Sequence, residues 1–339
     1  MEHTGLLEIR HLSARYPYGR EVLHDVSLRL HEGEILCIIG ESGSGKTTLL
    51  NAVLGMPGKV EITRGEILFA GQNLCAMKGE ELRRIRGRGI GMIYQEPGAS
   101  LNPIRRIGIQ FYDTMRAHMK ISKKEAEEKA LVLLSKMGLP EPERVLKSCP
   151  VQLSGGMNQR VAIALAMALE PALLLADEPT SALDVTVQAQ IVEELLKLRR
   201  EYGKTLVVVT HNMGVVAKMA DKVSVMYGGR IVEYGRRDHI LKAPAHPYTR
   251  ALLAAVPKLD GPPPKAIPGQ RFSHFPAVGC AFANRCPHAQ KDCGTRDMQP
   301  IFLDEEHWTL CDAGIREKCR PYPPTDNTEH FALQGSKGV

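Results

Sequence analysis

Two glycine-rich segments of the chain have the residue types that hold phosphate groups. The first reads Gly40-Glu41-Ser42-Gly43-Ser44-Gly45-Lys46-Thr47 and fits the pattern G-x-x-x-x-G-K-T, with Thr48 directly after it. In such a loop the backbone N–H groups surround the phosphates, the lysine reaches the β- and γ-phosphates, and the threonine hydroxyl binds Mg²⁺. The sequence therefore predicts that this loop binds ATP together with Mg²⁺.

The second segment reads Leu153-Ser154-Gly155-Gly156-Met157-Asn158-Gln159 and precedes a helix that we expect over residues 159–169. Backbone N–H groups at the start of a helix attract anions, so Ser154, Gly155 and Gly156 also suit a phosphate. One ATP molecule needs only one of the two segments. We interpret the pair as two halves of a composite site, in which each of two subunits supplies one half.

Two carboxylates, Asp177 and Glu178, follow the apolar run at residues 173–176. A carboxylate at a strand end suits Mg²⁺, directly or through water, and Glu178 one residue later suits a general base for the attacking water. An acidic exit from a strand is also common without catalysis. The glycine loop in the same chain favours the catalytic interpretation.

Three further side chains are candidates for the same site. His211 follows a predicted strand at residues 205–210 and could contact the γ-phosphate, although a histidine at a strand end is often structural. Gln95 follows residues 90–94 and could bind Mg²⁺ or position water. Tyr16 could stack on adenine, with Tyr18 as a close alternative and a packed aromatic as the simplest interpretation. The predicted catalytic set is Lys46, Gln95, Glu178 and His211, and the predicted Mg²⁺ ligands are Thr47, Gln95 and Asp177.

Alternating strands and helices must hold these residues. Apolar patterns predict strands at residues 7–12, 26–30, 34–39, 65–69, 172–176, 205–210 and 222–226. Helices are expected at residues 46–54, 122–137, 159–169, 185–202 and 213–220. This alternation predicts an α/β core with a parallel sheet, interrupted by a mostly helical insertion at about residues 96–168.

The composition excludes some classes of protein. The net charge of +6 is spread along the chain of 339 residues, so we expect no nucleic-acid partner. No apolar run approaches the roughly 18 residues of a membrane helix, and the N-terminus lacks the pattern of a signal peptide. We expect a cytosolic protein that meets a membrane through other subunits.

Five of the eight cysteines fall in the last sixty residues. Four of them, Cys280, Cys286, Cys293 and Cys311, are separated by five, six and seventeen residues. Structural zinc sites favour closer pairs, so an iron–sulfur cluster fits at least as well, and buried free thiols are the third possibility. Cys319 lies outside the pattern, and a proline-rich stretch at residues 261–264 is expected to be a linker.

Taken in this order, the motifs resemble those of the ATP-binding subunit of ATP-binding-cassette (ABC) transporters, over residues 5 to about 240. The resemblance implies a P-loop NTPase core of the ABC type with an antiparallel β subdomain. It also implies that residues 40–47 are the Walker A loop, Gln95 the Q-loop glutamine, Ser154–Gly156 the signature, Asp177 and Glu178 the Walker B residues, residues 181–184 the D-loop and His211 the switch histidine. Asn212 and Asn158 depart from the usual pattern without removing a catalytic group.

Residues 100–103, 246–253 and 279–287 are similar to the dipeptide/oligopeptide/nickel branch of these importers. The branch implies a nucleotide-binding domain at residues 1–240 and an extension at residues 241–339, whose cysteine-rich segment 279–312 holds a [4Fe–4S] cluster, with Zn²⁺ as the alternative. It also implies a second ATPase subunit, often a paralogue, two transmembrane permeases and an extracytoplasmic solute-binding protein. The expected location is peripheral, on the cytoplasmic face of the inner membrane.

The sequence leaves several alternatives open. The cargo is a dipeptide, a longer peptide, nickel or a metal chelate. A soluble ABC ATPase acting on ribosomes or DNA is a competing function, although such proteins usually carry two cassettes or a long coiled coil. A third possibility makes the cysteine-rich tail a metal or redox sensor.

Overall fold

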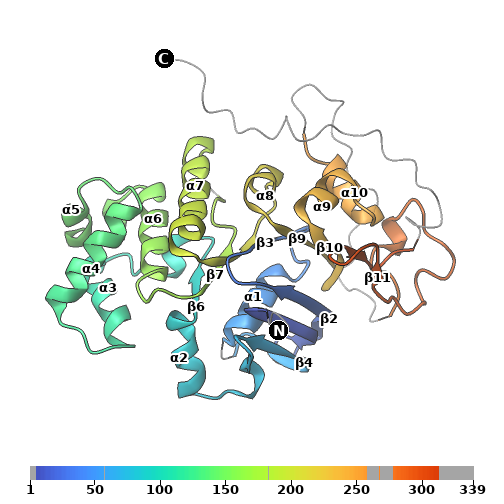
Figure 1. Cartoon of the computed structure of the whole chain (residues 1–339), viewed down its shortest axis with the longest axis horizontal. Helices are drawn as coiled ribbons and strands as arrows, with labels where there is room; N and C mark the ends of the chain where they lie inside the picture. The colour runs from blue at the N-terminus through green and yellow to red at the C-terminus, as the bar shows by residue number, and fades with distance from the viewer. Residues whose placement is uncertain (1–4, 57, 182, 258–266, 268–277, 313–339) are drawn as a thin grey trace, which may run out of the picture. The chain divides into compact units, whose positions relative to one another are not determined.

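The computed structural model describes residues 5–56, 58–181, 183–257, 267 and 278–312. The chain forms two compact units, each containing segments that are distant in sequence (Figure 1). Of the described residues, the first unit contains those within 5–30, 35–75 and 210–312, and the second contains those within 31–34 and 76–209. The cysteine-rich extension therefore belongs to the same unit as the glycine loop.

The first unit contains a four-stranded antiparallel sheet, as the resemblance implies. Its strands follow the order β2-β1-β4-β5. They are β1 (Leu7–Arg15), β2 (Glu21–Leu30), β4 (Glu61–Phe69) and β5 (Gln72–Asn73). In β2 the apolar residues Val26, Leu28 and Leu30 are buried and alternate with polar ones, which is the pattern of a strand with one face on the core.

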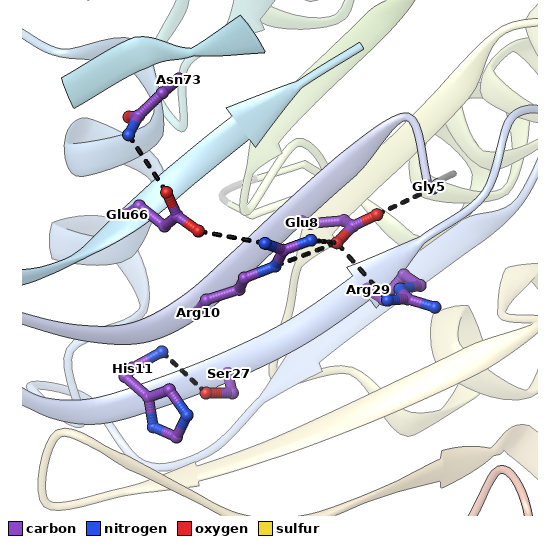
Figure 2. Close-up of polar contacts among 8 residues, drawn as sticks. All are labelled: Gly5, Glu8, Arg10, His11, Ser27, Arg29, Glu66 and Asn73. Carbon is purple, nitrogen blue, oxygen red and sulfur yellow. Dashed lines mark hydrogen bonds and ion pairs between the residues drawn. The ribbon is translucent and has the colours of Figure 1, made fainter. Parts of the chain in front are cut away.

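A cluster of hydrogen bonds and ion pairs connects β1 to its neighbouring strands in this sheet (Figure 2). Glu8 accepts hydrogen bonds from the Arg10 guanidinium at 2.7 Å and from the Gly5 N–H at 3.0 Å, and Arg29 lies 3.5 Å away. Arg10 also donates to Glu66 on β4 at 3.1 Å. Burial raises the pKa of Glu8, but these donors outweigh burial and hold the pKa below its usual value. Glu8 is therefore charged and links β1 to β2, while Arg10 links β1 to β4.

A second sheet in the same unit carries the glycine loop. Its strands in this unit follow the order β11-β12-β10-β9-β3. They are β3 (Ile35–Ile39), β9 (Lys222–Tyr227), β10 (Arg230–Arg236), β11 (Ile301–Phe302) and β12 (Trp308–Thr309). β3 is parallel to β9, and the other neighbours are antiparallel. The extension thus adds two short strands beside β10.

The helices of the first unit are α1 (Lys46–Leu54), α8 (Met213–Met219), α9 (Arg237–Lys242) and α10 (Pro247–Ala254). Two 3₁₀ turns, η1 (Leu74–Ala76) and η4 (Ala283–Arg285), complete the unit. No helix in the described part of the chain is both long enough and apolar enough to cross a membrane.

The second unit contains three parallel strands in the order β8-β7-β6 and most of the helices. The strands are β6 (Ile90–Ile93), β7 (Leu173–Asp177) and β8 (Thr205–Val209). The helices are α2 (Glu80–Arg88), α3 (Ile107–Arg116), α4 (Lys123–Lys136), α5 (Pro142–Lys147), α6 (Gly155–Ala166) and α7 (Val185–Tyr202), with 3₁₀ turns η2 (Pro97–Ala99) and η3 (Pro150–Gln152). The predicted parallel α/β core and helical insertion are confirmed.

Several predicted boundaries are wrong. Strand β1 ends at Arg15 rather than residue 12, β2 begins at Glu21 rather than residue 26, and β4 begins at Glu61 rather than residue 65. Helix α6 begins at Gly155 rather than Gln159, and it ends at Ala166. Ser154 caps it, because its side-chain oxygen accepts the Met157 N–H at 3.3 Å, and this bond allows the two glycines to form the first turn. The predicted linker at residues 261–264 and Cys319 lie outside the described residues.

Candidate functional site

The glycine loop joins the buried strand β3 to helix α1. Gly40 must be glycine, because a Cβ there would lie 2.2 Å from the carbonyl oxygen of Met226. Gly45 caps α1 with φ of 101° and offers no side-chain hydrogen bond to the helix. The N–H groups in the first turn of α1 have no partner within the helix, so they are available to an anion.

Two side chains of the loop suit a triphosphate. Lys46 is buried, and its Nζ donates to the carbonyl oxygens of Gly40 and Glu41, at 2.8 Å each. The Ser44 Oγ is buried and makes no hydrogen bond within the described chain. The loop therefore combines a cation, a buried hydroxyl and helix N–H groups, which fits the phosphates of a nucleotide with Mg²⁺.

Tyr16 lies beside the first turn of α1. Its hydroxyl is 2.8 Å from Thr48 Oγ1, and its ring is about half exposed, at 46%. Tyr18, the alternative, has a fully exposed side chain. Of the two tyrosines, Tyr16 is therefore the one that contacts the helix following the glycine loop.

In the second unit, β7 ends at the buried residue Asp177, and the backbone of Glu178 is strained. Its φ of 45° lies in the left-handed region, which is unfavourable for residues other than glycine. The Glu178 N–H donates to Val209 on β8 at 2.9 Å. The N–H and hydroxyl of Ser181 both donate to the Glu178 carbonyl at 3.0 Å. These bonds hold the acidic turn in one conformation.

The signature segment is fixed by α7 and by its own asparagine. A Cβ on Gly156 would lie 2.9 Å from Cγ1 of Val187, so only glycine fits without a shift. Asn158 Nδ2 donates to the Pro150 carbonyl at 3.0 Å and to that of Leu153 at 3.4 Å. This departure from the usual signature therefore ties α6 to the turn before it.

His211 and Gln95 are both exposed. His211 precedes α8, whose N-cap Asn212 accepts the N–H groups of Gly214 at 2.9 Å and Val215 at 3.4 Å. Asn and Asp cap helices equally well, so the second departure preserves the local fold. Gln95 lies two residues past the end of β6.

Each unit therefore gathers its own part of the predicted site. The first unit contains Tyr16, Gly40, Ser42, Gly43, Ser44, Gly45, Lys46, Thr47, Thr48 and His211. The second contains Gln95, Ser154, Gly155, Gly156, Asp177 and Glu178. Within each unit, the motifs lie at strand ends or helix starts, as their chemistry requires.

Sequence reasoning missed a link between the extension and the glycine loop. Arg285 Nη1 donates to Glu41 Oε2 at 3.0 Å and to the Tyr227 hydroxyl at 3.1 Å. The Tyr248 hydroxyl accepts the Glu41 N–H at 2.9 Å. Arg285 and Tyr248 both lie in segments that resemble the importer branch, so the sequence marks them as notable. Their contact with Glu41 depends on tertiary structure, and the sequence alone does not reveal it.

The four tail cysteines lie in one neighbourhood. The pKa values of Cys280 and Cys286 are raised to about 11, chiefly by burial and to a smaller extent by the nearby sulfurs, which include those of Cys293 and Cys311. The Cys280 N–H donates to the Cys293 carbonyl at 2.7 Å, and the Gln290 N–H donates to Cys293 Sγ at 3.3 Å. The four thiols therefore lie close enough to influence one another, and the Cys293 sulfur accepts a backbone hydrogen bond.

Comparisons with known proteins agree with this geometry. The family described as "ABC transporter" matches residues 23–181, and "Oligopeptide/dipeptide transporter, C-terminal region" matches residues 232–293. The dipeptide transport ATP-binding protein DppD of Bacillus subtilis is 42% identical over 316 residues, which cover 90% of this chain and 94% of DppD. The oligopeptide transport ATP-binding protein OppD of the same organism is 44% identical, over 90% of this chain and 88% of OppD.

Solved structures show the same fold. The ABC cassette MJ0796, in a dimeric post-hydrolysis state bound to ADP and Pi, is 32% identical with a TM-score of 0.61, covering 68% of this chain and 98% of that one. Fold, motifs and relatives agree, and ATP hydrolysis coupled to transport is the activity of this family. The chain belongs to the ATPase subunits of ABC transporters, in the oligopeptide/dipeptide branch.

Proposed function

We propose that this protein is the ATPase subunit of an importer for dipeptides or oligopeptides. Its relatives are dipeptide and oligopeptide transport proteins, and together with the matching C-terminal region they support a peptide cargo. The main observation behind the proposal is that a complete glycine loop and the extension typical of this branch belong to the same compact unit. Nickel or a metal chelate is the alternative cargo, and uptake of labelled peptide by the whole transporter distinguishes them.

The roles of the residues follow from their chemistry. Lys46 and the N–H groups of α1 would neutralise the β- and γ-phosphates, and Thr47, Gln95 and Asp177 would hold Mg²⁺, which neutralises developing charge. Glu178 would accept a proton from the attacking water, and His211 would orient that water near the γ-phosphate. Ser154 and Gly156 would bind the nucleotide held by the other ATPase subunit, through the N–H groups of α6.

An exposed apolar pair in the second unit supports docking to a membrane subunit. Ile104 is 81% exposed and Val151 is 68% exposed. The two segments adjoin, because the Val151 N–H donates to the Pro103 carbonyl at 3.3 Å and Cys149 Sγ donates to the Ile104 carbonyl at 3.3 Å. We infer that this surface, next to residues 95–102, contacts a permease at the cytoplasmic face of the membrane. An extracytoplasmic binding protein would deliver the cargo to two such permeases.

For the cysteine site we propose a [4Fe–4S] cluster, with Zn²⁺ as the alternative. Tetrahedral zinc with thiolates at about 2.3 Å places sulfur atoms about 3.8 Å apart. Among the described residues, the only set of three potential ligand atoms within 4.8 Å of one another contains no cysteine. The wider spacing of the thiols supports a larger group. Anaerobic purification tests this, because a cluster gives a brown protein with charge-transfer absorption and zinc gives a colourless one.

The substitution Glu178→Gln tests the assignment of the catalytic base. We expect ATP binding to be kept and turnover to fall by about 10²–10⁴-fold, because general-base catalysis contributes that much. The matched control is Glu193→Gln, which removes an exposed carboxylate on α7. Unchanged turnover in Glu178→Gln would exclude this residue as the base.

The competing function, a soluble ABC ATPase, has its own test. Co-purification of this protein with ribosomes or DNA instead of membrane subunits would support it.

A further inference from the structure

Three side chains of the first unit lie close together and are not among the residues predicted to bind or hydrolyse ATP. They are His239 on α9, and Asp304 and His307 in the turn between β11 and β12. Each offers one potential ligand atom, and these atoms all lie within 4.8 Å of one another. Two imidazoles and one carboxylate form a ligand set that transition metals of the zinc type use in proteins.

The carboxylate of Asp304 is already oriented toward His239. Its Oδ1 accepts the Glu306 N–H at 2.8 Å, and its Oδ2 lies 3.4 Å from His239 Nδ1. Tetrahedral zinc with N and O ligands at about 2.1 Å separates two ligand atoms by about 3.4 Å. The His239 Nδ1 is itself buried and makes no hydrogen bond within the described chain. These two atoms therefore have the spacing of two corners of a zinc site.

A buried carboxylate orients the third candidate ligand. His307 is 5% exposed, and its Nε2 lies 2.9 Å from Oε1 of the fully buried Glu233. Glu233 is fixed in turn by the N–H groups of Ala245 at 2.7 Å and His246 at 2.9 Å. A histidine that ligates a metal usually donates its other ring N–H to a carboxylate, which fixes the ring and raises its basicity. Glu233 thus leaves the Nδ1 of His307 for a metal.

We propose that His239, Asp304 and His307 form a binding site for a divalent transition-metal ion of the Zn²⁺ type, separate from the site of the four cysteines. Nitrogen ligands disfavour Ca²⁺ and Mg²⁺, which prefer oxygen. The nearby cations Arg236 and Lys222 both pair with Glu306 in the same turn. A bound ion joins α9 to the β11–β12 turn and completes its coordination with water or a partner's ligand.

The function of the ion would be to fix the extension on the sheet. β11 and β12 have two residues each, so their backbone pairing alone holds the turn weakly. Cys311 follows His307 by four residues. The metal would therefore position the segment that carries the last of the four tail cysteines.

Zinc binding by the full-length protein tests the proposal. The protein is stripped with a chelator and titrated with ZnCl₂, and zinc content and melting temperature are measured for the wild type, His239→Ala and Asp304→Asn. Asn keeps the acceptor for the Glu306 N–H but is a poorer ligand than a carboxylate. We expect each variant to bind one zinc ion fewer per chain, or to bind it roughly a hundredfold more weakly, because even loss of a supporting group costs 10–100-fold.

A control variant and the unchanged tail cysteines allow the result to be assigned to the proposed site. Lys242→Ala changes the same helix outside the cluster and should bind zinc as the wild type does. The tail cysteines are intact in every variant, so zinc held by them contributes equally. Equal zinc content and equal zinc-dependent stabilisation in the wild type, His239→Ala and Asp304→Asn would overturn the proposal. ATP hydrolysis is not part of the readout, so this outcome leaves the proposed function unaffected.

Discussion

Gly156 occupies a position where the neighbouring helix leaves no room for a side chain. Because Val187 is β-branched and stiff, Gly156→Ala should clash with it at a cost of about 1–3 kcal/mol, partly offset by the better helix propensity of alanine. In a Val187→Ala background the clash is absent, and Gly156→Ala should then raise the free energy of unfolding by up to about 1 kcal/mol. Urea denaturation of the four proteins in this cycle measures the difference. Equal effects in both backgrounds would show that Val187 does not set the size of this position.

His246 should make stability depend on pH. It is buried, its Nδ1 accepts the Tyr248 N–H at 3.0 Å at the start of α10, and burial lowers its pKa from 6.5 to about 4. The folded state therefore favours the neutral ring. This contribution is fully present above pH 6.5 and is lost as the pH falls toward 4, with a slope of about 1.4 kcal/mol per pH unit.

His246→Asn provides the comparison, because asparagine also caps a helix and does not titrate. Denaturant unfolding at several pH values should show a steeper loss of stability between pH 6.5 and 4 in the wild type than in this variant. Other histidines and carboxylates contribute equally to both curves. Parallel curves would mean that His246 is not held neutral in the folded protein.

The strands and helices show which parts of the fold a sequence can reveal. β3 is five buried residues followed by a glycine loop, and such a strong local pattern predicts both strand and site. β12 has two residues, which carry no periodicity, so its pairing with β10 could not be predicted. The start of α6 was missed because paired glycines usually mark a turn, whereas the Ser154 cap and the closeness of Val187 place them in a helix.

In the candidate site, too, local patterns can be predicted from the sequence, whereas contacts between distant residues cannot. Spacing along the chain is enough to predict the Walker A loop, because all the residues of that motif lie within eight positions. The ion pair between Arg285 and Glu41 joins residues 244 positions apart, and no local pattern predicts it.

This ion pair should couple the extension to nucleotide binding. Arg285 is largely buried, with a side chain 6% exposed, against 21% for Glu41. Removing one partner leaves a poorly solvated charge, so Arg285→Met should disturb the Walker A loop and weaken ATP binding several-fold. A fluorescent ATP analogue measures the dissociation constant, and absorbance shows whether the cysteine site stays intact.

The double variant Arg285→Met/Glu41→Met identifies the cause. With both charges gone, no charge is left unpaired, and ATP affinity should return toward that of the wild type. If the double variant binds ATP as weakly as Arg285→Met, the arginine acts through its packing on Tyr227 and Phe282 rather than through Glu41.

For the whole molecule, the main consequence of two phosphate-binding segments is that one chain should hydrolyse ATP poorly. Each complete site would combine the Walker A loop of one subunit with the signature of another. Lys46→Ala disables the first segment and Ser154→Arg the second, so a pair of identical subunits carrying either change has two defective sites.

Mixing the two variants tests this arrangement directly. In a mixed pair, one site combines the intact Lys46 of the Ser154→Arg subunit with the intact Ser154 of the Lys46→Ala subunit. We therefore expect phosphate release to rise well above that of either variant alone, toward about a quarter of the wild-type rate, because half of randomly formed pairs are mixed and each contains one of two sites. If each chain formed its site from its own two segments, mixing would restore nothing. Preformed pairs that cannot exchange subunits serve as the control, since they should stay inactive when mixed.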